Sequence, residues 1–477
     1  MNLDSGVAEQ LAPTERNKPA ALWQGRVISE GRFFSHVQEI SRGLPVVGCG
    51  LNLCEDRYRF LVAFFALLMR GQRTVLPSNH TEKVIAELID CYPSAYLLTD
   101  PENGYDSGAK RVVVAPNVDD NGRNRRVRAP VFRSDQVAAI NFTSGSTGLP
   151  VGHEKSWSVF HQGAELALAS LDLKRRSWNV VATVPPQHMY GLETSIFWPF
   201  FSDLVMDAGR PFFPEDIRRT LISSPLPCLL VSTPRHLQAC VESGVRRDNV
   251  AMVLSSTAPM SGSLAARVEQ AFGAPLYELF GSTETLSFAW RRPVEQQRWR
   301  LYSGMELKER DGHVLLQGGH LRYPVPLDDL LEIHSDREFS VVGRRSGIIK
   351  IGGKRSSLAE LNRRLTDIDG IMDGLFFTPD NDAATHRVGA IVVSELSRPV
   401  ILRELRRSLD GLFLPRPILY VDRIPRNAMG KVVKAELERL IAAQAGSAPA
   451  GIGCDGPSSG QPTSLAGAGT SGMVRRR

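Results

Sequence analysis

Cysteine is scarce in this sequence, and long apolar runs are missing. Six cysteines are scattered over 477 residues without the paired spacing of a metal site. A chain of this length with so few cysteines is expected to keep them as reduced thiols in the cytoplasm. The longest apolar run, residues 60–69, is too short for a bilayer, which needs about 20 helical residues. We therefore expect no membrane insertion, and we interpret this run as a buried helix.

A dense stripe of basic residues interleaved with aromatic residues is also missing. The formal net charge is +6 and the pI about 9.0, but without such a stripe the charge argues only weakly for nucleic-acid binding. Residues 344–440 hold 18 Lys and Arg against 12 Asp and Glu, an excess as large as that of the whole chain. This stretch is either a solvated basic surface or a docking face for an acidic partner.

The first part of the chain alternates short β-rich runs with helical patterns. Hydrophobic residues make up 42% of the chain, enough for a large core, and its length suggests two domains. The alternation predicts an α/β fold with substantial parallel sheet, whose ligands lie beyond the carboxyl ends of the strands. Strands are expected at 74–77, 95–99, 112–114, 180–184, 228–231 and 252–255.

The texture changes near residue 343. We expect a hairpin at 348–353 and a helix at 358–365, after short strands at 314–317 and 330–333. The prediction is a large N-terminal layered α/β domain, a hinge at 343–347 and a small mobile α+β domain. Residues near the end are rich in Gly, Ser, Ala and Pro, which is typical of disorder. The predicted boundaries are 1–343, 344–442 and 443–477.

The strongest local signal is the stretch INFTSGSTGLP at 140–150. An apolar strand leads directly into small hydroxyl-bearing residues and glycines, a composition that lets backbone N–H groups approach a polyphosphate. The stretch lacks the Gly-Lys-Ser/Thr ending of a P-loop, which argues against an ordinary P-loop NTPase. The predicted phosphate-binding residues are Thr143, Ser144, Gly145, Ser146, Thr147 and Gly148.

With this loop, three later motifs resemble the adenylate-forming superfamily of acyl-CoA synthetases, aryl-acid ligases, luciferases and peptide-synthetase adenylation domains. They are SSTAP at 255–259, YELFGSTE at 277–284 and PRNAMGK at 425–431, and Gly343-Arg344 resembles the hinge motif. The motifs follow the superfamily's order from about residue 60 to residue 431. This resemblance implies ATP and Mg²⁺ as cofactors and an acid–thiol ligase activity that forms AMP.

The resemblance also implies roles for particular residues. Phe280 offers a ring for adenine stacking. Thr283 binds the α-phosphate, Glu284 supplies an oxygen ligand to Mg²⁺, and Lys431 neutralises charge during adenylation. Further nucleotide-binding residues implied by the motifs are Ser256, Thr257, Ala258, Glu278, Gly281, Asp329 and Arg344, with Asp328 as a rival of Asp329 for the ribose. His188 is assigned to the acyl pocket and the catalytic group, with Tyr190 and Leu192 beside it.

Three positions depart from the superfamily's pattern. Val151 stands where the phosphate loop usually carries a lysine, so that Lys155 or His153 would have to supply the charge. Ser346 replaces the hinge aspartate, and Ser256-Thr257 stand where Gly or Ala is usual. These departures bear on the rate of the reaction more than on its class.

The predicted function is the activation of a carboxylic acid by ATP and transfer of its acyl group to a thiol. Residues 184–200 and 142–147, with Lys155-Ser156-Trp157, resemble the ligases of aryl-polyene and xanthomonadin pigment clusters. That resemblance implies a hydroxybenzoate-type acid and the phosphopantetheine thiol of an acyl carrier protein. Three alternatives stay open: a synthetase using free coenzyme A, a non-catalytic binder of nucleotide or acyl-adenylate, and a nucleic-acid-binding protein.

Overall fold

The computed structural model forms two compact units, Met1–Val433 and Lys434–Arg477. In the second unit the described element is helix α12 (Lys434–Gly446). The structure describes residues 8–9, 18–104, 108–117, 130–144, 150–246, 249–310, 312–344, 348–351, 354–378, 387–427 and 432–446.

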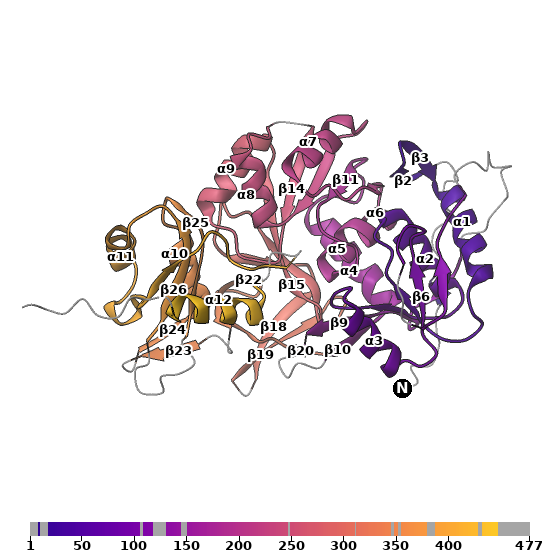
Figure 1. The fold of residues 1–477 in the computed structure, drawn as a ribbon. Helices are drawn as coiled ribbons and strands as arrows, with labels where there is room; N and C mark the ends of the chain where they lie inside the picture. Colours follow the sequence, from indigo (N-terminus) through magenta and orange to yellow (C-terminus); the bar gives the residue numbers. More distant parts are fainter. Residues whose placement is uncertain are drawn as a thin grey trace, which may run out of the picture. The chain divides into compact units, whose positions relative to one another are not determined.

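The first unit contains a six-stranded sheet in the order β10-β9-β5-β4-β6-β7. Figure 1 labels β6, β9 and β10 of this sheet. All neighbours are parallel except β10, which folds back against β9. Every residue of β4, β5 and β6 is buried, as expected for parallel strands covered on both faces. The strands are β4 (Gly50–Asn52), β5 (Thr74–Leu76), β6 (Tyr96–Thr99), β7 (Arg111–Val113), β9 (Val137–Ser144) and β10 (Pro150–Ser156).

The second large sheet has eleven strands, in the order β21-β22-β17-β16-β15-β14-β13-β11-β12-β2-β3. Its middle, from β15 to β2, is parallel, and its outer strands are antiparallel. The strands are β2 (Pro19–Trp23), β3 (Arg26–Ser29), β11 (Asn179–Ala182), β12 (Val205–Asp207), β13 (Cys228–Ser232), β14 (Val250–Ser255), β15 (Leu276–Ser282), β16 (Leu286–Arg291), β17 (Trp299–Leu301), β21 (Asp329–Ile333) and β22 (Glu338–Arg344).

Helices cover both sheets. Residues of α7, α8 and α9 share one apolar core with β13, β14 and β15. A small antiparallel sheet, β18-β19-β20, follows β17 along the chain. The helices before residue 343 are α1 (Glu30–Gly43), α2 (Arg57–Met69), α3 (Glu82–Cys91), α4 (Trp157–Ser170), α5 (Met189–Leu192), α6 (Trp198–Phe200), α7 (Pro214–Ser223), α8 (Pro234–Glu242) and α9 (Gly262–Phe272). The remaining strands there are β1 (Ala8–Glu9), β8 (Phe132–Arg133), β18 (Met305–Arg310), β19 (His313–Gly318) and β20 (Val325–Pro326).

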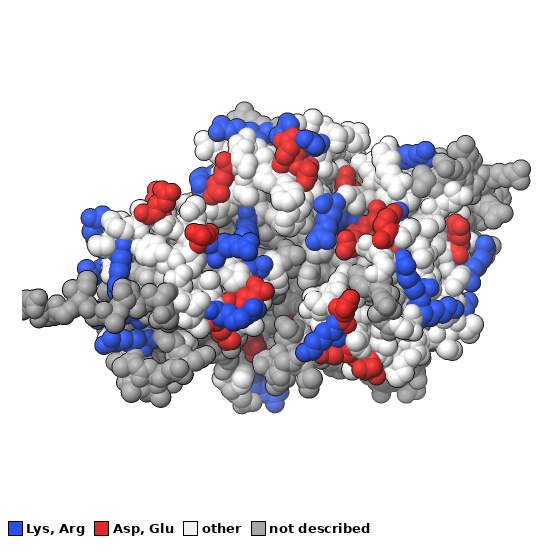
Figure 2. All heavy atoms as spheres, viewed as in Figure 1, with Lys and Arg blue, Asp and Glu red and all other residues white. Residues whose placement is uncertain are grey.

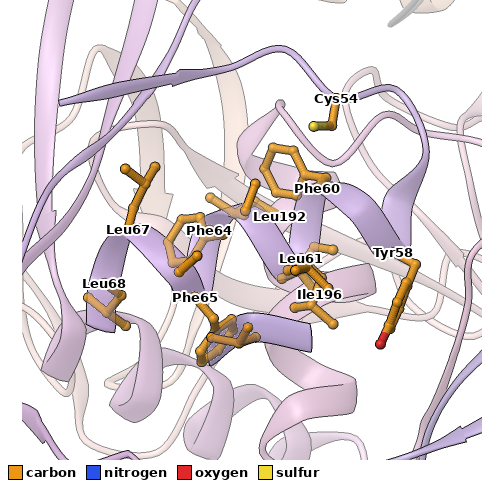
Figure 3. Packing of buried hydrophobic residues seen from close by; sticks show 14 of the residues in the cluster. Cys54, Tyr58, Phe60, Leu61, Phe64, Phe65, Leu67, Leu68, Leu192 and Ile196 are labelled. Atoms are coloured by element: carbon orange, nitrogen blue, oxygen red, sulfur yellow. The ribbon is translucent and has the colours of Figure 1, made fainter. Parts of the chain in front are cut away.

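Helix α2 is the apolar centre of the N-terminal part. Asp56 caps it by accepting a hydrogen bond from the Arg59 amide at 2.8 Å, and the residues from 57 to 68, except Arg59, are buried. Figure 3 shows Phe60 and Phe64 of this helix beside Leu192 of α5. The run at 60–69 is therefore the buried helix that its composition predicts, and no helix among the described residues has the length and hydropathy to cross a membrane.

After residue 343 the described chain builds a separate apolar core from residues 349–418. The expected hairpin and helix are present, and Ser357 caps the helix by accepting from the Glu360 amide at 3.1 Å. The fold class is thus confirmed: a large N-terminal α/β part precedes a smaller β-rich part. The domain boundaries and the hinge stay predictions. The elements are β23 (Ile348–Ile351), β24 (Lys354–Ser357), α10 (Leu358–Thr366), β25 (Ile371–Phe377), β26 (Gly389–Ser394), α11 (Arg398–Arg406) and β27 (Ile418–Tyr420).

Candidate active site

The predicted phosphate loop lies at the tip of the β9–β10 hairpin. Antiparallel pairing sets Ser144 opposite Pro150 and Thr143 opposite Val151, so the two strands bring the loop's ends together. The Thr143 hydroxyl is half-buried and lies 3.1 Å from Nε2 of His153. Residues 145–149 and the side chain of Ser144 lie outside the described part of the chain, and their predicted roles stay predictions.

The turn between β15 and β16 presents Thr283 and Glu284. Gly281 is required here, because a Cβ on it would lie 2.1 Å from the Leu286 carbonyl oxygen. Thr285 holds the turn from inside: its hydroxyl accepts from the Ser282 amide at 3.0 Å, and its carbonyl lies 2.6 Å from His320 Nε2. Thr283 and Glu284 themselves are half-buried, so the turn leaves both side chains partly accessible.

The Glu284 carboxylate lies beside two basic side chains of β10. Its Oε1 is 3.4 Å from His153 Nε2, and Lys155 donates a hydrogen bond to its carbonyl oxygen. Burial opposes ionisation of Glu284, but the Ser282 hydroxyl, His153 and Lys155 outweigh it and hold the pKa of the carboxyl below its usual value. Both candidates for replacing the loop lysine thus contact the predicted metal ligand.

An ionised, accessible carboxylate fits a magnesium ion. Mg²⁺ is commonly held by one or two carboxylates together with the phosphates of a bound nucleotide. Among the described residues no group of three or more His, Cys, Asp or Glu is arranged to hold a metal. Glu284 is therefore the residue that we assign to Mg²⁺, with the nucleotide supplying further oxygens.

A buried polar cluster lies behind this turn. Lys155 is 8% exposed and Glu193 is 6% exposed. The charge of each residue offsets part of the pKa shift that burial causes in the other. Burial lowers the pKa of Lys155 and raises that of Glu193. The Glu193 carboxylate accepts from the Ser287 amide at 3.0 Å and its hydroxyl at 2.8 Å, and Tyr302 donates to the same hydroxyl at 3.1 Å. The cluster ties the start of β16 to the segment after His188.

The predicted adenine side is built at the ends of β14 and β15. Thr257 has a backbone φ of +81°, and its hydroxyl is buried without a hydrogen-bond partner. A non-glycine residue in this conformation is strained, and such strain clusters at functional sites. The Ser256 hydroxyl donates to the Leu279 carbonyl at 3.0 Å, and Ala258 is exposed.

Phe280 and Glu278 differ in their surroundings. The ring of Phe280 is half-buried against three aromatic rings, those of Phe288, Trp299 and Phe339 at centroid distances of 5.4, 5.0 and 5.7 Å. Glu278 is 2% exposed, forms an ion pair with Arg291 and accepts from the Met260 amide at 2.9 Å. Glu278 thereby holds the adenine-side loop, while its contact with nucleotide stays a prediction.

Asp329 and Arg344, predicted fifteen residues apart for the ribose and the hinge, are cross-strand partners. They pair across the antiparallel β21–β22 ladder. The sequence spacing therefore corresponds to a real spatial neighbourhood. The side chain of Arg344 lies outside the described part.

His188 is half-buried directly before α5. Arg57, fully buried, anchors the strand leading to it by donating to the carbonyls of Ala182 and Val184 at 2.9 and 3.0 Å and to the Ser195 hydroxyl. Ser195 belongs to a π-helical turn, Glu193–Phe197, and π-helical turns are frequent at functional sites. The Tyr190 hydroxyl is buried; burial raises its pKa, and a hydrogen bond from the Ser232 backbone partly offsets that rise.

Sequence reasoning missed Arg57, Glu193 and His320. Glu193 had a signal, since it is the one charged residue in the mostly apolar stretch 189–200. Arg57 and His320 had none, because their partners lie far away in the sequence. Lys431, the predicted adenylation lysine, lies outside the described residues.

Comparison with known proteins identifies one family. The model of the family described as "AMP-binding enzyme" matches residues 8–312. The 2-succinylbenzoate–CoA ligase of Listeria monocytogenes serotype 4b (strain F2365) is 25% identical over 332 residues, which are 64% of this chain and 70% of the relative. The 4-coumarate–CoA ligase of Halorhodospira halophila is 27% identical over 312 residues, 63% of this chain and 76% of the relative.

Solved structures share the fold. The O-succinylbenzoate coenzyme A synthetase from Bacillus subtilis, in complex with AMP, superimposes with a TM-score of 0.75 at 17% identity, covering 88% of this chain and 95% of its own. An anthranilate CoA ligase in complex with anthranoyl-AMP also gives 0.75 at 17% identity, covering 90% and 95%.

Proposed function

The chain belongs to the AMP-binding enzyme family, and we propose that it uses ATP and Mg²⁺ to convert a carboxylic acid to an acyl-adenylate and then passes the acyl group to a thiol. One observation carries the proposal. Thr143 of the phosphate-loop hairpin and Glu284 of the turn after β15 meet through a single side chain, His153. Two motifs 141 residues apart in sequence thus form one polar site.

The reaction requires the carboxylate and the α-phosphorus of ATP to be positioned together and the charge on the phosphates to be stabilised. A carboxylate is a poor electrophile, and attack of its oxygen on the α-phosphorus of ATP releases pyrophosphate and leaves AMP as a good leaving group. The thiol sulfur then attacks the acyl carbon, the bond to AMP breaks, and the thiol proton passes to solvent. We assign Thr283 and the Thr143 loop to binding the phosphates, Phe280 to the adenine and Lys431 to the approaching carboxylate. Mg²⁺, when bound by Glu284, neutralises phosphate charge.

We propose an aryl acid of the hydroxybenzoate type as substrate. The curated relatives named above are ligases of 2-succinylbenzoate and 4-coumarate, both aryl acids. In this chain the half-buried His188 and Tyr190, both from the segment that Arg57 anchors, would face such an acid.

For the acceptor we propose the phosphopantetheine thiol of an acyl carrier protein, with coenzyme A as the alternative that the relatives' names favour. The excess of basic residues in 344–440 supports an acidic protein partner. Figure 2 shows that, on the face drawn, basic side chains are interspersed with acidic ones. We therefore expect a distributed docking surface rather than one basic patch.

Five of the cysteines are free thiols, which supports a cytoplasmic setting.

The test is pyrophosphate release with ATP, Mg²⁺ and a panel of aryl and fatty acids. Wild type is expected to release pyrophosphate only with its acid, and Lys431→Ala to lower the rate by orders of magnitude. Glu284→Gln, nearly isosteric but uncharged, should raise the Mg²⁺ concentration needed for half-maximal rate. Transfer is then compared with coenzyme A and with carrier protein. ATP binding without release for any acid would reject the ligase and favour a nucleotide sensor.

A further inference from the structure

We propose that Lys155 and His153, on one face of β10, are positioning residues that hold the Glu284 turn in place for Mg²⁺-bound ATP. The inference rests on the proposed function, because it gives these residues a role toward the nucleotide of the same site. Neither side chain is assigned to the reacting atoms. Both act through Glu284.

Strand geometry places the two side chains together. Residues alternate between the faces of a strand, so 153 and 155 of β10 point to the same side. Both reach Glu284, one at its carboxylate and the other at its carbonyl. Glu154, on the opposite face, pairs instead with Arg73 at 3.2 Å. The contacts with Glu284 therefore belong to one face of the strand.

Burying the charge of Lys155 lowers the stability of the folded state. This cost indicates that the residue has a role. A buried charge lowers stability unless it is compensated, and well-packed apolar residues are often equally stable in such places. Here the compensation is specific. Lys155 donates a hydrogen bond to the Glu284 carbonyl. Glu193, which supplies the opposite charge, accepts hydrogen bonds from the amide and the hydroxyl of Ser287. Two buried charges thus hold the two ends of a four-residue segment.

His153 contacts the carboxylate of Glu284 itself. Its Nε2 lies within reach of both Thr143 and Glu284, so the ring links the phosphate-loop strand to the proposed metal ligand. Groups that orient a metal ligand typically change metal affinity by 10–100-fold when they are removed. We therefore expect Lys155 and His153 to set the Mg²⁺-dependent part of ATP affinity.

The experiment compares Lys155→Met, Glu193→Gln and the double variant in the full-length protein. Two quantities are measured: the thermal unfolding midpoint, and the ratio of the ATP dissociation constants in EDTA and in Mg²⁺ by calorimetry. Each single variant should unfold at lower temperature, and the double variant should regain part of the loss because no uncompensated charge remains. The Mg²⁺-dependent ratio should fall by about 10-fold in Lys155→Met and stay low in the double variant.

Two further variants keep the test decisive. Lys174→Met removes a lysine that pairs with Glu165 at the protein surface, and it should leave both quantities unchanged. His153→Leu alters a side chain that is 20% exposed, so it should fold, and it should also lower the ratio. An unchanged ratio in His153→Leu, or a ratio that recovers together with stability in the double variant, would overturn the inference. Absence of ATP binding or pyrophosphate release in wild type would instead reject the proposed function.

Discussion

At the scale of single residues, the pair Arg291–Glu278 should be the most sensitive ion pair of the adenine side. Glu278 is 2% exposed, and Arg291 Nε donates to it at 2.7 Å while its guanidinium lies over Trp299 at 4.4 Å. Arg291→Met leaves a buried carboxylate without its partner, which should lower the free energy of unfolding by about 3–5 kcal/mol. Urea unfolding measures this.

The control for that prediction is an exposed pair of the same kind. Arg219 is 72% exposed in its side chain and lies 3.1 Å from Glu215. Arg219→Met should cost less than about 1 kcal/mol, since exposed ion pairs contribute little. Equal losses in the two variants would mean that Glu278 relaxes toward water.

His236 should make stability depend on pH. Burial, with help from Arg235 and Arg210, lowers its pKa from the ordinary 6.5 to about 4, and its Nδ1 lies 3.2 Å from the Thr183 hydroxyl. The folded state therefore binds this proton less readily than the unfolded state. Stability contributed by neutral His236 is full above pH 6.5 and is lost as the pH falls toward 4.

The measurement is the free energy of unfolding at about pH 7 and about pH 5, in wild type and His236→Asn. Wild type should lose about 1–2 kcal/mol more than the variant between these values. Asn keeps an amide near the place of Nδ1 but does not titrate, so equal losses in both proteins would refute the assignment.

The sequence reveals single residues where a motif surrounds them. Thr143, Thr283 and Glu284 are recognisable because small hydroxyl-bearing and glycine residues frame them, and Gly281 has a steric reason in the turn. Lys155 and Glu193 are different. Lys155 contacts Glu284 in the β15–β16 turn, and Glu193 contacts Ser287 of β16. Both partners lie more than 90 positions away along the chain, and only the tertiary fold brings them together.

At the scale of elements, Arg57 joins three segments. From the first turn of α2 it donates to the carbonyls of Ala182, the last residue of β11, and of Val184 just beyond it, and to Ser195 in the π-helical turn. Burial lowers the pKa of Arg57 to about 10, so it stays charged at neutral pH. Arg57→Met should lower the free energy of unfolding by about 3 kcal/mol or more, because the carbonyls of Ala182 and Val184 lose their buried donor.

The same substitution should also distinguish the two halves of the site. The segment that Arg57 anchors carries His188, whereas the nucleotide motifs follow β9 and β15. KM for the acid should therefore rise several-fold while KM for ATP changes little. Steady-state kinetics at saturating co-substrate measure both constants. A parallel rise of both would indicate a general loss of structure rather than a local one.

Most elements follow from the sequence, and their arrangement does not. Parallel strands such as β11 and β13 are apolar runs bounded by turns, so their positions are predictable to within about two residues. The pairing of β2 with β12 joins segments about 185 residues apart. No local pattern encodes such a neighbour, because strand order depends on crossover connections through whole helices.

At the scale of the whole molecule, the described residues form five apolar core clusters. Four core clusters draw their buried residues only from positions before 343, and the fifth draws them only from 349–418. The hinge near 343 stays a prediction, and separate cores on its two sides are compatible with it. A rotation of the later part about that hinge would separate adenylation from thiol transfer.

The acceptor is decided at this same scale, because net charge acts over a whole surface. Arg406, in the last turn of α11, is exposed, and Arg267 of α9 is an exposed arginine before residue 343. If an acidic carrier protein docks on the later part, Arg406→Glu should lower the rate of acyl transfer to the carrier by about 3–10-fold, and Arg267→Glu should not.

Raising the salt from about 0.05 to about 0.5 M should slow transfer to the carrier in wild type, since screening shortens the reach of surface charges. Pyrophosphate release should be unaffected by either variant. Transfer that is indifferent to Arg406→Glu and to salt, with efficient use of free coenzyme A, would instead establish coenzyme A as the acceptor and leave the basic excess a solvated surface.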